Sequence, residues 1–371
     1  MIFITFISLD VYIILWYNIS MRFFLLFCVL LLSGCLEMTV SNAEHSPLEP
    51  VVSGTHLRTW RIDVDIPLAK KEKTFGLYFW NKEDGCNYLC GLNREIEILG
   101  DVPDYVLYFT DLRRRAPNHI FNINADYDIK TVLSQDLRVY KQKNNTTILM
   151  EIAEGKWDGY FLSLAEEMRK FGGEIYYRFG YEMNGDWFPW GRQPEHFKLA
   201  WKHVWELFRE AEADRVVWVF SPSVLYGDLT LHQGLYEYYP GDAYVDVVGV
   251  DGYNFGSMIT YHDWKSVREV FHETITGLKS RYPHKPLWIC EVGSAPNEMW
   301  AGRSKSEWLH RFLTYYNTES RIENFIWFNE DKAYNGEANW RLDSDQATLA
   351  KFRQWLGTDP LLISLRNSTF K

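Results

Sequence analysis

The 371-residue sequence has no long run of lysine or arginine, and its formal net charge is -10. Nucleic-acid-binding surfaces depend on clustered basic side chains, so DNA and RNA are not expected partners. Charged residues make up 24% of the chain and hydrophobic residues 47%, which is the composition of an ordinary globular protein. The length allows one large domain or two of ordinary size.

Cysteine is also scarce, with five residues in the whole chain. Cys86 and Cys90 are four positions apart, and in an oxidising compartment this spacing indicates a local disulfide. A zinc site would need two more good ligands nearby, and the sequence offers none, so neither a metal nor a cofactor is expected. Cys290 lies in a predicted strand and is expected to be a buried free thiol.

Aromatic residues, by contrast, are abundant at 17%, and 16 of them are tryptophan. A tryptophan-rich core is one interpretation. A carbohydrate-binding cleft, in which sugar rings stack on flat aromatic faces, is the other and the favoured one.

Short apolar segments alternate with longer amphipathic ones from about residue 74 to 357. The predicted strands are Phe75–Trp80, Tyr105–Phe109, Thr147–Ile152, Glu174–Phe179, Val216–Ser221, Val245–Asp251, Pro286–Glu291 and Arg321–Phe328. The predicted helices are Lys156–Phe171, Pro194–Glu212, Trp264–Tyr282, Ser304–Tyr316 and Ser344–Leu356. Pro117–Lys130 is interpreted as a loop insertion, and Leu57–Val64 as an edge strand outside the main sheet.

Eight strands with helical crossovers predict a (β/α)8 barrel, also called a TIM barrel, in a single domain. The alternative is an open doubly wound sheet. That fold is expected to carry a glycine-rich nucleotide-binding turn after its first strand, and Trp80–Gly85 is not such a turn.

The N-terminal region has the pattern of a bacterial lipoprotein signal. Arg22 precedes an apolar run, and Leu32–Cys35 matches a lipobox, whose cysteine receives lipid. We therefore expect residues 1–35 to be a signal segment, with Met21 as the true start and Cys35 as the lipidated residue. A plain signal peptide or a membrane anchor helix is the alternative.

The mostly polar residues 36–55 are expected to tether the lipid to a domain spanning residues 56–371. Leu36 is not an aspartate, which favours the outer membrane over the inner one. The expected location is thus the cell envelope, facing the periplasm or the exterior.

The C-terminal ends of barrel strands carry the active site in this architecture, and here they carry carboxylates. Glu182 ends the predicted fourth strand among aromatic residues, and Glu291 ends the seventh. Two facing carboxylates are the minimum for glycoside hydrolysis, one as acid and one as nucleophile. The purely structural alternative is that one of them forms an ion pair with Arg178 inside the barrel.

Alternation within the strands places Leu287, Ile289 and Glu291 on one face, and Asp251 and Tyr253 on one face of the neighbouring strand. Tyr253 is then positioned to donate a hydrogen bond to Glu291.

Five stretches, in order over residues 178–343, resemble glycoside hydrolase family 26, the β-mannanase family. They are Tyr181–Gly191, Val217–Pro222, Tyr239–Asp246 with Gly249–Asn254, Ile289–Ser294, and Trp327–Asn329 with Trp340–Asp343. The resemblance implies a retaining mechanism with Glu182 as acid/base, Glu291 as nucleophile and Tyr253 as its support. Substrate contacts are expected from Arg178, Tyr181, Asn184, Trp187, Trp190, Asp251 and Trp327.

One departure from the family concerns Tyr181, because the family usually has histidine immediately before the acid/base glutamate. That residue contacts the sugar next to the scissile bond, where mannose and glucose differ in the orientation of the 2-hydroxyl. The change at Tyr181 therefore bears on which sugar is bound. From the family resemblance, the expected activity is a retaining endo-β-glycosidase on β-1,4-mannan. Mixed-linkage β-1,3-1,4-glucan, β-1,3-xylan and an exopolysaccharide of the cell itself are alternative substrates.

The protein is expected to be a monomer. From another class of function, a lipoprotein that binds polysaccharide without cutting it also remains open. Binding alone needs the aromatic residues but not the two glutamates, which argues for the enzyme.

Overall fold

The computed structural model describes residues 73–80, 86–139, 145–227, 229–257, 262–298 and 302–358, and the backbone of 2–5 and 59–62. The chain divides into two compact units, Met1–Ile66 and Pro67–Lys371. In the first, β1 (Ile2–Thr5) pairs antiparallel with β2 (Thr59–Ile62), so the predicted strand at 57–64 does form outside the barrel. The predicted lipobox and the tether lie outside the described residues.

The second unit contains a closed barrel of eight parallel strands, which confirms the predicted (β/α)8 fold. The strands are β3 (Thr74–Phe79), β4 (Tyr105–Asp111), β5 (Lys130–Asp136), β6 (Ile175–Phe179), β7 (Val216–Phe220), β8 (Val247–Asn254), β9 (Leu287–Ser294) and β10 (Ile322–Asn329). β10 pairs with β3 over six residues and closes the barrel.

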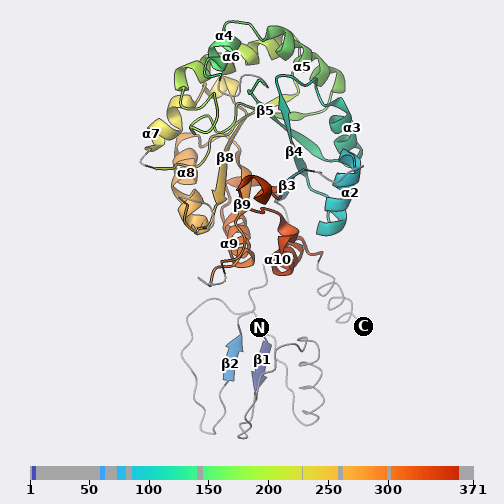
Figure 1. The fold of residues 1–371 in the computed structure, drawn as a ribbon, viewed down its shortest axis with the longest axis vertical. Helices are drawn as coiled ribbons and strands as arrows, with labels where there is room; N and C mark the ends of the chain where they lie inside the picture. The colour runs from blue at the N-terminus through green and yellow to red at the C-terminus, as the bar shows by residue number, and fades with distance from the viewer. Residues whose placement is uncertain are drawn as a thin grey trace. The chain divides into compact units, whose positions relative to one another are not determined.

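Helices surround the strands (Figure 1). The longer ones are α2 (Tyr88–Leu99), α3 (Asn118–Asp126), α5 (Asp158–Phe171), α6 (Pro194–Glu210), α8 (Val267–Arg281), α9 (Lys305–Thr318) and α10 (Gln346–Leu356). The shorter ones are α4 (Ile148–Ala153), α7 (Leu231–Gly234), η1 (Tyr236–Tyr238), η2 (Asp242–Tyr244), η4 (Ala333–Asn335) and η5 (Leu342–Ser344). Among the described segments, no helix is both long and apolar enough to span a membrane.

The prediction of the third barrel strand was wrong. Thr147–Ile152 was expected to be a strand, but residues 148–153 form α4. The actual third strand is β5, and Pro117–Lys130, interpreted as a loop, contains α3. The reason is that β5 carries the polar residues Ser134, Gln135 and Asp136, whose side chains are buried inside the fold. An apolar run was therefore a misleading guide to this strand.

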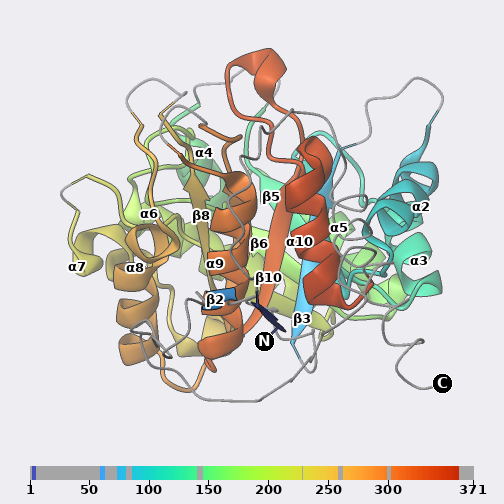
Figure 2. The same cartoon turned by 90° about the horizontal axis from the view of Figure 1, so that it is seen from below.

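Side-chain alternation divides the core into two layers. On β6, Ile175, Tyr177 and Phe179 pack against the helices, whereas Tyr176 packs among the side chains of the barrel interior. Figure 2 shows α10 beside β3 and β10, where Phe75 and Phe325 contact Trp355. Tryptophan-rich packing of this kind accounts for part of the unusual aromatic content.

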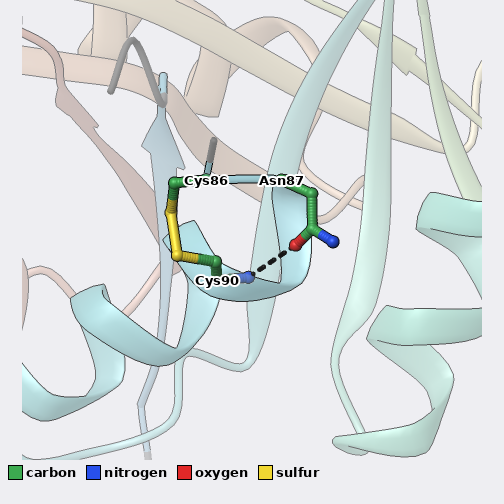
Figure 3. The surroundings of a disulfide bond; sticks show 3 residues. All are labelled: Cys86, Asn87 and Cys90. Carbon is green, nitrogen blue, oxygen red and sulfur yellow. Dashed lines mark hydrogen bonds between the residues drawn. A yellow bond between two sulfur atoms is a disulfide. The ribbon is translucent and has the colours of Figure 1, made fainter. Parts of the chain in front are cut away.

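A disulfide joins Cys86 to Cys90, as the spacing indicated, and Cys290 is a buried free thiol, also as predicted. The disulfide lies at the start of α2, where the Asn87 side chain accepts a hydrogen bond of 3.0 Å from the Cys90 backbone N–H (Figure 3). Bond and cap together fix the first turn of α2.

Replacing both Cys86 and Cys90 by serine is expected to lower the free energy of unfolding by about 2 kcal/mol, because the closed loop is short. Urea denaturation of the oxidised wild type and the double variant measures this difference. Reduced wild type is the matched control and should unfold like the variant. An unchanged midpoint would contradict a stabilising role for the bond.

Candidate active site

Glu182 lies just beyond the end of β6, in an unusual backbone conformation. Gly180 has φ +54° and Glu182 has φ +52°, both in the left-handed region. For a residue with a side chain this conformation is strained, and strain of this kind is concentrated at functional sites. A hydrogen bond of 2.8 Å from the Glu182 N–H to the Ser221 carbonyl holds the turn against the end of β7. The Glu182 side chain is thereby directed into the mouth of the barrel.

Glu291 reaches the same place through an irregularity in β9. Strict alternation predicted that Glu291 shares a face with Leu287 and Ile289, and this was wrong. Leu287 and Ile289 pack against the helices, but the β8–β9 register passes from Val250↔Ile289 directly to Asp251↔Glu291. The extra residue, Cys290, is a β-bulge that turns Glu291 toward the barrel interior. The predicted shared face of Asp251 and Tyr253 is consistent with regular pairing along β8.

The two glutamates line one pocket of about 750 Å³ at the C-terminal ends of the strands. Carboxylate oxygens of Glu182, Asp251 and Glu291 all lie within 4.8 Å of one another. Such a cluster would ordinarily repel itself, so the groups around it decide which carboxyls carry charge.

Arg178, from β6, supplies the opposing charge and is completely buried. Its Nη1 donates to Glu291 Oε1 at 2.8 Å and its Nη2 donates to Asp251 Oδ2 at 2.5 Å. Burial opposes the charge of Arg178, but the two carboxylates outweigh it and raise its pKa above the ordinary value. The ion pair foreseen as a structural alternative therefore exists, and Glu291 nevertheless lines the pocket.

The carboxylate cluster does not fit a metal ion well. Asp251 Oδ1 accepts from the Ser221 hydroxyl at 2.8 Å, and Glu291 Oε2 accepts from the Tyr253 hydroxyl at 2.6 Å. Arg178 occupies the remaining oxygen of each group and neutralises one charge. A cation would have to displace these donors.

Tyr253, on β8, bonds Oε2 of Glu291, whereas Arg178 bonds Oε1. Burial, and then the negative charge of Glu291, raise the pKa of Tyr253 well above its ordinary value. The phenol therefore keeps its proton and remains a hydrogen-bond donor to Glu291 across the physiological pH range.

Glu182 has the opposite electrostatic character. Burial and the charge of Glu291 raise the pKa of Glu182 to about 7, against a weaker opposing effect of the Trp187 indole. The indole Nε1 donates to Glu182 Oε2 at 2.6 Å. A proton-carrying Glu182 beside an Arg178-paired Glu291 is the division of roles that acid/base and nucleophile require.

Two of the four aromatic residues predicted to bind substrate lie at the pocket. Trp187 is 46% exposed, and Tyr181 lines the wall with its ring against Phe109, Phe188 and the Arg178 guanidinium. Tyr181 is only 6% exposed, so little of it is available to a ligand.

The other two, Trp190 and Trp327, are fully buried in the core, contrary to the prediction. Trp190 stacks on Phe188 and donates to the Tyr181 carbonyl at 2.8 Å. Trp327 donates to the Trp340 carbonyl at 2.9 Å and faces α9, where it contacts Trp308. On β10 the residues that face inward are one position away from Trp327, because side chains alternate.

The predicted polar contacts Arg178, Asn184 and Asp251 lie behind the pocket wall. Asn184 is 1% exposed and exchanges two hydrogen bonds of 2.8 Å with the backbone of Ser223. It fixes the loop after β6 to the loop after β7. In this structure these three residues position the site, and none of them is open to a ligand.

Several residues of the pocket were not predicted from the sequence. They are Tyr78, Phe109, Phe328, Glu330 and Trp340. Phe328 was accessible to sequence reasoning, because alternation makes it the inward partner of Trp327 on the same strand. Glu330 accepts a hydrogen bond of 3.3 Å from the Tyr78 hydroxyl, a pairing across 252 positions that no local pattern reveals.

Comparisons with known proteins show which proteins this chain is similar to. A model of glycosyl hydrolase family 26 matches residues 118–293, a range that holds both glutamates. Endoglucanase H of Acetivibrio thermocellus is 32% identical over 235 residues, which cover 58% of this chain and 25% of that protein. Mannan endo-1,4-beta-mannosidase A and B of Caldalkalibacillus mannanilyticus is 25% identical over 243 residues, or 62% of this chain and 42% of that protein. The chain therefore spans less than half the length of either relative.

Among solved structures, the catalytic domain of the endo-beta-1,4-mannanase of Bacillus sp. JAMB-750 superposes with a TM-score of 0.57. The superposition covers 79% of this chain and 90% of that domain at 15% sequence identity, so it speaks for the fold alone. Residues 118–293, which include Glu182 and Glu291 at the strand ends, are thus similar in sequence to glycosyl hydrolase family 26.

Proposed function

We propose that the protein is a retaining endo-β-glycosidase. The observation that carries the proposal is the close approach of the Glu182 and Glu291 carboxylates, within 4.8 Å of each other. Retaining glycosidases keep their two carboxyl groups roughly 5–5.5 Å apart, whereas inverting enzymes leave roughly 6.5–9.5 Å for a water molecule. The short separation favours direct attack on the sugar.

In the first step, Glu182 donates its proton to the glycosidic oxygen while Glu291 attacks the anomeric carbon. The bond to the leaving sugar breaks, and a covalent glycosyl–Glu291 ester forms. In the second step, the ionised Glu182 takes a proton from water, whose oxygen displaces Glu291 from the same carbon. Arg178 and Tyr253 hold Glu291 through both steps.

For the substrate, we propose β-1,4-mannan first and β-glucan as the second candidate. Two names among the relatives motivate this pair, a mannan endo-1,4-beta-mannosidase and an endoglucanase. Tyr181 lies beside Glu182 on the pocket wall, so it is the residue on which the choice is expected to depend.

Release of reducing ends from a panel of mannan, mixed-linkage β-glucan, β-1,3-xylan and bacterial exopolysaccharide tests the proposal. Proton NMR of the first product gives the configuration at the new reducing end. Retained β-configuration with rapid loss of polymer viscosity is expected for a retaining endo-enzyme. An inverted product would overturn the assigned roles, and binding without cleavage would favour a glycan-binding protein.

The pH dependence follows from the pKa of Glu182. Only the protonated form donates to the leaving group, and the pKa is about 7. The value of kcat/KM is therefore expected to be retained below pH 7 and to fall about tenfold per pH unit well above it. A pH profile measured on the best polysaccharide of the panel checks this result.

Replacing Trp187 by phenylalanine sharpens the test. The indole stabilises the charged form of Glu182, so its loss raises the pKa of Glu182 and moves the alkaline limb to higher pH. Trp205→Phe, on α6, is the matched control and should leave the limb in place. If the alkaline limb of the kcat/KM profile does not move in the Trp187 variant, a group other than Glu182 controls the pH dependence.

We further propose that the protein is lipid-anchored through Cys35 in the cell envelope and acts there as a monomer. The lipobox pattern at Leu32–Cys35 supports the anchor. Detergent-phase partitioning of the full chain tests it, because Cys35→Ser should move the protein to the aqueous phase. Partitioning that is insensitive to this substitution would argue for a different attachment.

A further inference from the structure

A second cavity, of about 680 Å³, adjoins the catalytic pocket. Arg138, Trp187 and Phe188 line both cavities, so a glycan chain bound beside Glu182 has a direct path from one to the other. Nothing in the mechanism above uses this second cavity. We call it the arginine pocket, after Arg113, Arg114 and Arg138 in its lining.

The arginine pocket is built from one short motif that occurs twice. Asp111–Arg113 and Asp136–Arg138 both read Asp-Leu-Arg, and they end the adjacent strands β4 and β5. The strand register pairs Asp111 directly with Asp136, so the two motifs lie side by side.

Both copies fold in the same way. The arginine backbone N–H donates to its aspartate, at 2.9 Å from Arg113 to Asp111 Oδ1 and at 2.7 Å from Arg138 to Asp136 Oδ1. Each guanidinium then donates through Nε and Nη2 to the same carboxylate. The aspartates are buried and the arginines about half exposed, so each carboxylate holds a planar guanidinium group at the pocket surface.

The described lining of this pocket contains three arginines and three aspartates, and Arg192 lies just outside it. Asp111 and Asp136 each balance one arginine, and Asp186 in the same lining pairs with Arg192 at 3.1 Å. Arg114 shares Asp111 with Arg113 through its Nε at 3.3 Å, and within the described part of the chain its Nη atoms have no partner. Among the described residues, four guanidinium groups, those of Arg113, Arg114, Arg138 and Arg192, thus share three aspartates.

The chemistry of the lining indicates an acidic sugar. Trp80 and Trp187 are 44% and 46% exposed and offer flat faces for a sugar ring. The planar guanidinium group of arginine matches the geometry of a carboxylate. A guanidinium that is already held in place loses little conformational freedom when a ligand binds. Neutral hydroxyls also accept from arginine, but a carboxylate would in addition pair with the positive charge of Arg114, which has no aspartate of its own among the described residues.

We infer that the arginine pocket is a subsite for a uronic-acid residue of the polysaccharide. This inference rests on the proposed glycosidase activity and refines its substrate class. The expected substrate is a β-linked mannan or glucan chain that carries carboxylated sugars a few residues from the bond that is cut.

The test compares one backbone with and without carboxylates. The probes are β-1,4-mannan, the same mannan with a fraction of its C6 hydroxyls oxidised to carboxylates, and oxidised mannan reduced back to the alcohol. Mixed-linkage β-glucan treated identically replaces mannan if glucan is the better substrate. Wild type is expected to show kcat/KM about tenfold higher on the oxidised chain, with the preference lost on reduction and weakened by salt.

In the variants Arg114→Gln and Arg138→Gln, the ratio of kcat/KM on oxidised mannan to kcat/KM on native mannan should fall about tenfold, toward unity. Arg209→Gln is the matched control, because Arg209 also pairs with an aspartate at the surface but lies on α6. Equal kcat/KM on neutral and oxidised chains in wild type, or a ratio unchanged in both pocket variants, would overturn the inference while leaving the glycosidase assignment intact.

If no chain is cut, the proposed function fails, and calorimetric titration then decides on the subsite separately. Tighter binding of oxidised than of native mannan, lost in Arg114→Gln, supports the subsite. Equal binding of the two chains overturns it.

Discussion

Glu291→Gln is expected to abolish hydrolysis of natural polysaccharide, and Glu182→Gln to lower kcat by about 10²–10⁴-fold. The larger effect belongs to Glu291 because an amide cannot form the covalent ester, while Arg178 and Tyr253 remain in place around it. Reducing-end assays on matched amounts of folded protein measure both losses.

Alanine variants separate the two roles. With an aryl glycoside whose leaving group needs no protonation, Glu182→Ala should still form the glycosyl–Glu291 ester but hydrolyse it slowly. Intact-protein mass spectrometry should therefore detect the adduct in Glu182→Ala and not in Glu291→Ala. Glu195→Gln, an exposed glutamate on α6, is the control and should retain full activity. Substantial polysaccharide cleavage by Glu291→Gln would contradict the assignment.

Arg178→Met is expected to have the largest effect on stability, lowering the free energy of unfolding by about 3–5 kcal/mol. The substitution keeps an apolar stem of similar length but leaves the buried carboxylates of Asp251 and Glu291 without their cation. Removing one member of a buried ion pair lowers the free energy of unfolding by more than the intact pair adds to it. The reason is that the remaining charge stays buried without a partner. Urea denaturation at neutral pH measures the loss.

Two comparisons make this prediction specific. Arg311→Met removes an exposed ion pair with Glu307 and should cost less than about 1 kcal/mol. The double variant Arg178→Met/Asp251→Asn removes one of the stranded charges and should be more stable than Arg178→Met alone. Equal stability of the Arg178 and Arg311 variants would show that the buried cluster does not depend on its arginine.

Most of the barrel could be predicted from sequence because its strands are short apolar runs separated by amphipathic helices. The failure at the third strand has a definite cause. β5 buries Ser134, Gln135 and Asp136, so its pattern resembles a loop, while the apolar face of α4 resembles a strand. Ser134 accepts from Arg178 at 2.9 Å, so the polar character of this strand serves the carboxylate cluster.

The sequence predicted that Glu182 and Glu291 meet, and both line one pocket, but it did not predict how they are held there. Glu182 and Glu291 stand out as carboxylates at the ends of facing strands, and the motifs around them resemble one family. Trp327 was assigned to the cleft by residue type, whereas strand alternation turns it toward α9 and leaves Phe328 at the pocket.

The sequence by itself determined the fold class, the two carboxylates that meet in the pocket and the disulfide spacing, because each depends on residue type or local spacing. Only the tertiary structure decided which groups surround those carboxylates and in which direction their side chains point. The bulge at Cys290 turns Glu291 inward, and Arg178 pairs with it from 113 positions away. The register of β4 and β5 likewise joins two Asp-Leu-Arg motifs into one pocket, since pairing between strands is invisible to local sequence.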